Sequence, residues 1–353
     1  MNPIRVLAAL LLSASVFAQV DPVEEEAWSK AMAIKQKREW PAAIAALQEF
    51  RRQYPDRSRA LQAQIEIGVC WIGEAQNNLV LRRPTPKALE SYTTAEALFR
   101  EVLDSPSGKE LAPRAQYLMG QLSWYRDDMA AAFTAYDAGV RTYAADATYH
   151  AKCLERRAAV SRALLDHAAA MQDYKLYIER YSNDKDIAIV RRSRDYTALC
   201  GRPAPAFSAD RWALGQPLTR EGLLGQPVLV SFMASWCEKC DKEKEFIKDL
   251  KKRYGPRGLR FVGVVHPWRE KEGKNRHTEE SFLTFAAQSG LDFPLLQDSG
   301  ELTGNTARAF GSQALPDLVL IDAQGNVRWH DHPASLQAST IERLLTSKPA
   351  QPK

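Results

Sequence analysis

The sequence predicts two folded units, an all-α helical domain followed by an α/β domain with a mixed sheet. Its 353 residues are enough for two domains, and 45% of them are apolar. In the first half, which is rich in Ala, Leu, Tyr, Arg and Glu, apolar residues recur at helical spacing. The composition changes abruptly at residues 200–205, which read CGRPAP. Beyond them, short apolar runs alternate with helical patterns, which is typical of an α/β fold.

The N-terminus has the pattern of a secretory signal peptide. Arg5 precedes an apolar run at residues 6–17, and Val16 and Ala18 are small residues at the positions that a signal peptidase reads. We expect residues 1–18 to be cleaved. The apolar run is short for a bilayer span, and no later stretch is long and apolar enough. We therefore expect a soluble protein that is periplasmic or secreted.

Residues 22–199 are expected to form the helical domain, and they contain an internal repeat. Small and aromatic residues recur after 38 positions, since Gly120, Ala132, Tyr136 and Tyr143 correspond to Ala158, Ala170, Tyr174 and Tyr181. We expect the small residues where paired helices touch closely and the aromatic residues in the grooves between repeats. Residues 77–86 interrupt the pattern and are interpreted as an inserted loop.

This pattern resembles tetratricopeptide-type (TPR) repeats, although Ser123 stands where an aromatic residue is expected. The resemblance implies stacked helix pairs with a concave face, and such faces usually bind a peptide or a partner protein. We therefore expect a protein partner for the helical repeats. A spacer or dimerisation arm without a specific ligand is the alternative.

The second domain is placed at residues 201–347, with residues 348–353 as a flexible tail. Period and composition predict four strands, at residues 226–233, 259–266, 315–322 and 326–331. Four helices are predicted at residues 241–254, 278–288, 305–310 and 336–345. A tight turn at residues 323–325 joins the last two strands as a hairpin.

The most informative motif is the pair Cys237 and Cys240, which follows a strand pattern and opens a charged helix pattern. A cysteine at a helix N-terminus faces unpaired N–H groups and the positive end of the helix dipole, so its thiolate is stabilised. The second cysteine lies about one turn further on and can close a disulfide. The alternatives are a structural bridge and half of a zinc site, but no second ligand pair with suitable spacing follows. We expect a redox-active disulfide, with no metal and no other cofactor.

Three segments in the same order resemble the TlpA/ResA-like branch of the thioredoxin superfamily, which is related to the AhpC/TSA proteins. They read GRPAPAF at residues 201–207, VLVSFMASWC at 228–237 and GSQALPDLVLID at 311–322. The resemblance implies a thioredoxin-like fold for the C-terminal domain and thiol–disulfide oxidoreductase activity.

The resemblance also implies roles for five residues. Cys237 is expected to be the exposed nucleophile, and Cys240 the buried resolving cysteine. Pro316 resembles the cis-proline opposite the motif, which presents the preceding backbone to an incoming chain. Trp236 is expected beside the disulfide, with plain core packing as the alternative. Glu243 matches a carboxylate that exchanges a proton with Cys240, and the alternative is an ordinary exposed helix acid.

The expected function is the reduction of protein disulfides, with electrons from a membrane electron-donor protein. Potentials in this fold range from about −270 to about −120 mV, so a disulfide oxidant or isomerase is the first alternative. A thiol peroxidase is disfavoured because Val230 and Ala234 stand where that chemistry needs Pro and Thr or Ser. A redox-regulated protein-binding scaffold is the remaining alternative.

Nucleic acid and metal ions are not expected partners. The formal net charge is +5, but basic clusters are scattered and mixed with acidic residues, which favours solubility over nucleic-acid binding. His330 and His332 alternate along a predicted strand and are interpreted as an exposed pair without further ligands.

Three cysteines lie outside the motif, namely Cys70, Cys153 and Cys200. In an exported protein two of them can form a structural disulfide, and the sequence leaves open which two. The alternative is buried, inert thiols, as the helical surroundings of Cys70 and Cys153 suggest. Cys200, at the domain boundary, is the one candidate for a third redox thiol.

Overall fold

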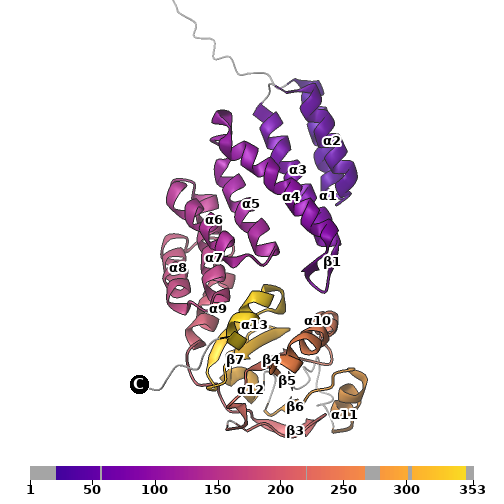
Figure 1. The fold of residues 1–353 in the computed structure, drawn as a ribbon, viewed down its shortest axis with the longest axis vertical. Coiled ribbons are helices and arrows are strands. Elements are labelled where there is room, and N and C mark those ends of the chain that lie inside the picture. Colours follow the sequence, from indigo (N-terminus) through magenta and orange to yellow (C-terminus); the bar gives the residue numbers. More distant parts are fainter. Residues whose placement is uncertain (1–20, 56–57, 220, 267–278, 301–303, 347–353) are drawn as a thin grey trace, which may run out of the picture.

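The computed structural model describes residues 21–55, 58–219, 221–266, 279–300 and 304–346. Its helical half packs against a half that contains a sheet (Figure 1). The predicted signal peptide and C-terminal tail lie outside the described residues. Within the described residues, no helix is both long enough and apolar enough to cross a membrane.

The first half of the chain is largely helical, as predicted. Its helices are α1 (Pro22–Gln36), α2 (Trp40–Gln53), α3 (Ser58–Asn77), α4 (Pro86–Asp104), α5 (Ala112–Tyr125), α6 (Met129–Thr142), α7 (Ala147–Ala163), α8 (His167–Arg180) and α9 (Ile187–Leu199). Each helix packs against the next one along the chain. The assignment to TPR-type repeats stays a prediction, as do the domain boundaries.

Local sequence explains where several of these helices begin and how closely they pack. Asp128, Asp146 and Asp166 each cap a helix by accepting a hydrogen bond from a backbone N–H of its first turn. Gly120 lies directly against Tyr136, because a Cβ atom at residue 120 would come within 2.5 Å of that ring. The small residue therefore stands where two helices touch.

The segment at residues 77–86 is a short β-hairpin rather than a loop. Strands β1 (Leu79–Val80) and β2 (Arg83–Pro84) pair antiparallel and are joined by two residues. The hairpin extends from the helical half toward helix α10 (Glu238–Tyr254), which contains Cys240 (Figure 1). Arg82 and Arg83 of the hairpin contact that helix through their side chains.

The second half contains a six-stranded mixed sheet in the order β3-β6-β5-β4-β7-β8. The strands are β3 (Ala209–Ala213), β4 (Val228–Met233), β5 (Arg260–Val265), β6 (Leu295–Asp298), β7 (Asp317–Ile321) and β8 (Val327–Asp331). Strand β4 runs parallel to β5 and antiparallel to β7. The four predicted strands are present. Two strands were not predicted, β6, which has only four residues, and β3, a short, partly exposed strand at the sheet edge.

Helices cover both faces of the sheet. Helices α10 (Glu238–Tyr254), α11 (Glu279–Gln288) and α13 (Ala338–Thr346) contribute to one apolar core. Helix α12 (Asn305–Ala309) contributes to the core on the opposite face. The register pairs Phe232 of β4 with Asp317 of β7, so the ends of these two strands lie side by side.

The two halves meet in a buried contact that we call the α7–β8 interface, formed by Arg162, His167, Tyr196, His330 and Asp331. Arg162 of α7 forms an ion pair with Asp331 of β8. The ring of Tyr196 in α9 stacks on His330, with 3.7 Å between the ring centroids. The Nε2 atom of His167 lies 2.6 Å from the backbone carbonyl oxygen of residue 328. These contacts fix the helical half against the last strand of the sheet.

Candidate active site

The cysteine motif lies between the end of strand β4 and the first turn of helix α10. All six residues of β4 are buried, and Cys237 is the N-cap residue of the helix. The N–H group of Cys240 donates a hydrogen bond to Sγ of Cys237 at 3.1 Å. Helix α10 starts at Glu238, three residues earlier than predicted. A sulfur in this position faces the unpaired N–H groups and the positive end of the helix dipole. Both stabilise its thiolate form.

Cys237 and Cys240 form a disulfide, with 5.2 Å between their Cα atoms. Cys237 is 7% exposed and Cys240 is 3% exposed, so both are buried in the oxidised form. The predicted contrast between an exposed and a buried cysteine is therefore small in this state. Trp236, which precedes the disulfide, is 42% exposed. This exposure does not fit plain core packing for Trp236.

The Leu315–Pro316 peptide bond is cis. Pro316 directly precedes β7, whose first residue pairs with Phe232 near the end of β4. The cis-proline segment therefore lies at the same edge of the sheet as the segment that leads to Cys237.

Glu243 lies one turn after Cys240 on the same face of α10. Its side chain is 13% exposed and forms an ion pair with Arg82 of the β1–β2 hairpin. The guanidinium carbon of Arg82 also lies 4.2 Å from the ring centroid of Phe246. Glu243 is therefore not an ordinary exposed acid. Nothing in the local sequence indicates Arg82 as a partner, because it is 161 residues away.

The remaining cysteines are not paired with one another. Cys70, Cys153 and Cys200 are free thiols. Burial raises the pKa of Cys70 to about 11 and the pKa of Cys153 and Cys200 to about 12. At neutral pH these groups are protonated, which makes them poor nucleophiles. The possible structural disulfide is absent, and Cys200 lacks the chemistry of a redox thiol.

A second pair of polar groups near the cis-proline was not foreseen. The Nε2 atom of His330 lies 2.6 Å from Oδ2 of Asp317, and both residues are buried. The expectation that His330 and His332 form an exposed pair is wrong, because helix α9 covers His330. His332 instead follows β8, and its Nδ1 accepts a hydrogen bond from the N–H of Ala334 at 3.0 Å. No cluster of three metal-ligating side chains occurs among the residues that the structure describes.

Known proteins resemble the second half of the chain. Residues 200–330 match the AhpC/TSA family. The thiol:disulfide interchange protein DsbE of Xylella fastidiosa (strain 9a5c) is 33% identical over 156 residues, which cover 43% of this chain and 70% of that protein. The thiol-disulfide oxidoreductase ResA of Bacillus thuringiensis (strain Al Hakam) is 28% identical over 127 residues, covering 36% of this chain and 66% of ResA.

A putative thiol:disulfide interchange protein DsbE from Chlorobium tepidum, known from a crystal structure, is 22% identical. It aligns with a TM-score of 0.33, covering 41% of this chain and 95% of that one. The relationship itself follows from the identity and coverage of the Xylella protein. The chain therefore belongs to the AhpC/TSA family and is a thiol-disulfide oxidoreductase homologous to DsbE and ResA.

Proposed function

We propose that this protein reduces disulfides of other proteins in the periplasm or outside the cell. The observation that carries the proposal is the Cys237–Cys240 disulfide at the N-terminus of α10, with Cys237 as its N-cap. The helix dipole and the N–H of Cys240 favour a thiolate at Cys237. The signal-peptide pattern at residues 1–18 supports export.

In the proposed reaction the reduced pair transfers two electrons to a substrate disulfide. The Cys237 thiolate attacks one substrate sulfur, which forms a mixed disulfide and releases the other sulfur as a thiolate. Cys240 then gives its proton to Glu243 and attacks Sγ of Cys237. This step forms the Cys237–Cys240 bond, breaks the mixed disulfide and releases the second substrate thiolate. A membrane electron-donor protein reduces the pair for the next cycle.

The surroundings of the disulfide support a peptide-like substrate. Trp236 exposes an aromatic surface beside Cys237, and such surfaces contribute much of the binding energy at protein interfaces. The backbone of Leu315, just before β7, lies at the same edge of the sheet. We propose that this backbone pairs with the substrate chain next to the attacked disulfide.

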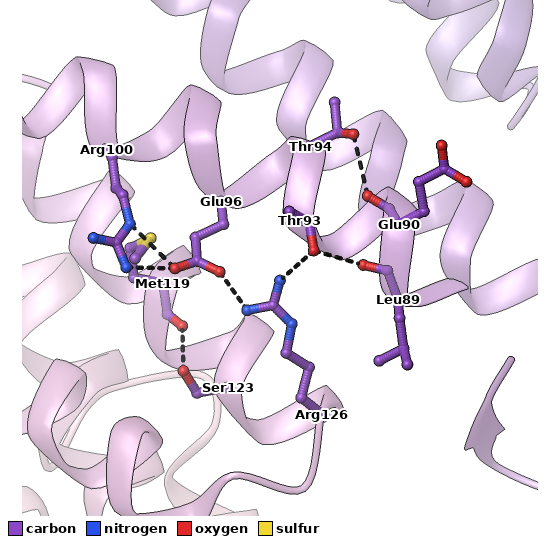
Figure 2. A network of polar contacts seen from close by, with 9 residues as sticks. All are labelled: Leu89, Glu90, Thr93, Thr94, Glu96, Arg100, Met119, Ser123 and Arg126. Atoms are coloured by element: carbon purple, nitrogen blue, oxygen red, sulfur yellow. Dashed lines mark hydrogen bonds and ion pairs between the residues drawn. The ribbon is translucent and has the colours of Figure 1, made fainter. Parts of the chain in front are cut away.

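A groove in the helical half is the proposed site for a partner or substrate protein. It lies between α4, α5 and α6, has a volume of about 610 Å³ and includes Glu96, Met119 and Arg126. Figure 2 shows Glu96 between Arg100 and Arg126, and Arg126 also donates a hydrogen bond to Thr93. Apolar and charged groups together suit an extended peptide with both kinds of side chain.

The direction of the redox reaction is tested by the reduction potential of the Cys237–Cys240 pair. It is measured in glutathione buffers, with Cys70, Cys153 and Cys200 replaced by alanine. A potential below about −230 mV is expected and places the protein among reductants. A potential near or above about −150 mV contradicts the proposed direction and favours an oxidant or isomerase.

The role of the groove is tested with two neighbouring substitutions on α6. Ala131 lines the groove, whereas the exposed Ala130 does not. Ala131→Arg is expected to slow reduction of a protein substrate while leaving reduction of a small disulfide unchanged. Ala130→Arg is the control and should change neither rate. Equal effects of the two substitutions would contradict substrate binding in this groove.

A further inference from the structure

We propose that Arg82, which the helical half supplies, is a positioning residue of the redox site. Its ion pair with Glu243 orients that carboxylate beside Cys240, so that Glu243 can accept the Cys240 proton. This inference rests on the proton-accepting role proposed above for Glu243. It assigns the β1–β2 hairpin, which interrupts the helical pattern, a part in the reaction of the other domain.

The hairpin turn is built from residues that do not suit it. Leu81 and Arg82 join the two strands with backbone φ angles of 47° and 65°. A two-residue turn with both φ angles positive strongly prefers Asn, Asp or Gly, because other side chains are strained there. Leu and Arg therefore make the turn less stable than it could be. Such strain is typical of functional positions.

Stabilisation of the fold does not by itself explain the contacts of Arg82. One guanidinium nitrogen forms the ion pair with Glu243, and the guanidinium lies over the ring of Phe246. The other terminal nitrogen, Nη1, is buried without a hydrogen-bond partner among the described residues. Burial lowers the pKa of Arg82, and the charge of Glu243 partly offsets this. An unused buried donor costs free energy, so the ion pair is not explained as an optimal contact between domains.

The neighbouring residue Arg83 provides a comparison within the same hairpin. Arg83 lies 3.2 Å from Asp249 of α10, which also binds Arg253 at 2.8 Å. Glu243 is three residues after Cys240 and Asp249 is nine, which corresponds to about 4.5 Å and about 14 Å along the helix axis. At physiological ionic strength charges are screened beyond about 8 Å. Arg82 therefore acts on the environment of Cys240, and Arg83 does not.

Loss of the guanidinium should move proton transfer to higher pH. A mostly buried carboxylate without its cation favours the neutral acid, which cannot accept a proton. His332 is close enough to Glu243 and Arg82 for an electrostatic interaction, and the charges of Asp317 and Asp331 also act on it. Burial lowers the pKa of His332, so this histidine is neutral above about pH 6.5. Glu243→Gln therefore decides whether a shifted profile reports on the Arg82–Glu243 pair or on His332.

The test follows the Cys240 step in the full-length chain, with Cys70, Cys153 and Cys200 replaced by alanine. The reduced protein is mixed with a chromogenic aryl disulfide in a stopped-flow instrument. The first aryl thiolate is released when Cys237 attacks, and the second when Cys240 resolves the mixed disulfide. The rate of the second release is recorded against pH for the parent, Arg82→Gln, Glu243→Gln and the double variant.

The rate of the second thiolate release should fall at low pH, and we call this part of the profile its acid limb. In Arg82→Gln, the midpoint of the acid limb is expected to move up by about 1 pH unit. Glu243→Gln should abolish this limb, and the double variant should match it because the two residues act together. If Glu243→Gln abolishes the limb but Arg82→Gln leaves it in place, the role of Arg82 is overturned and the proposed reaction stands. If Glu243→Gln leaves the limb unchanged, the role of Glu243 fails, and that of Arg82 fails with it.

Three more variants separate this role from a structural one. Arg83→Gln removes the neighbouring ion pair and should leave the pH profile unchanged. Arg82→Lys keeps a cation, so its pH profile should be shifted less than that of Arg82→Gln. Leu81→Asn combined with Arg82→Gly gives the hairpin the residues that its turn prefers, yet it should shift the profile as Arg82→Gln does. If the variant with Leu81→Asn and Arg82→Gly folds and keeps the pH profile of the parent, the proposal is overturned.

Discussion

Two of the contacts between the halves of the molecule differ in burial and in whether they reach the active-site helix. In the α7–β8 interface the Arg162 side chain is 3% exposed and faces Asp331. At the hairpin, the side chains of Arg82 and Arg83 are 30% and 50% exposed, and their partners lie on the active-site helix. One contact is a buried core between domains. The other is a partly solvated link that reaches the helix of the reacting cysteines.

The difference indicates that one contact mainly stabilises the fold and the other mainly affects the redox site. A buried ion pair with one partner removed leaves an uncompensated charge, so the α7–β8 interface should dominate the stability of the assembly. Partly exposed pairs contribute little to stability, because solvent screens them and two long side chains must be ordered. What the hairpin contributes should therefore appear in the chemistry of the cysteines. Its effect on folding should be small.

The largest effect is expected from Arg162→Met. This substitution leaves Asp331 without its cation, and the free energy of unfolding should fall by about 3–5 kcal/mol in urea titrations. Adding Asp331→Leu should recover much of the loss, because no charge then remains buried without a partner. A loss below about 1 kcal/mol for Arg162→Met would show that the two contacts do not differ as proposed.

Acid is expected to lower stability through two histidines, of which only His167 lies in the α7–β8 interface. Burial lowers the pKa of His266 to about 4 and also lowers the pKa of His167 in the α7–β8 interface. The unfolded state then binds more protons, so stability is complete above about pH 6.5 and is lost as the pH falls toward 4. For His266 alone the loss approaches roughly 3 kcal/mol, at 1.36 kcal/mol per pKa unit.

The measurement is the free energy of unfolding between pH 7 and about pH 4.5, for the parent and for His266→Phe. The phenylalanine cannot take up a proton, so the variant should show a flatter dependence. Phe232 already packs edge-on to the ring of His266, with 6.4 Å between centroids, so an aromatic side chain suits the site. An equally steep dependence in both proteins would assign the acid sensitivity to other groups.

The same division explains which features the sequence could predict. The Cys237–Cys240 motif, the segment around Pro316 and the four main strands are local patterns, and they were recognised from neighbouring residues. The link from Arg82 to Glu243 joins residues 161 positions apart, and nothing local indicates such a contact. His330 is a similar case, because Tyr196, which stacks on its ring, belongs to the distant helix α9.

The smallest effects are expected from Arg82→Gln and Arg83→Gln, which should each lower the free energy of unfolding by less than about 1 kcal/mol. Both pairs are partly exposed and lie in the same hairpin, so their losses in urea titrations should be similar. The two variants should then differ in the pH dependence of the Cys240 step and agree in stability. If Arg82→Gln instead cost more than about 2 kcal/mol, its altered pH profile would have a structural cause. The hairpin would then belong with the α7–β8 interface as a contact that holds the two halves together.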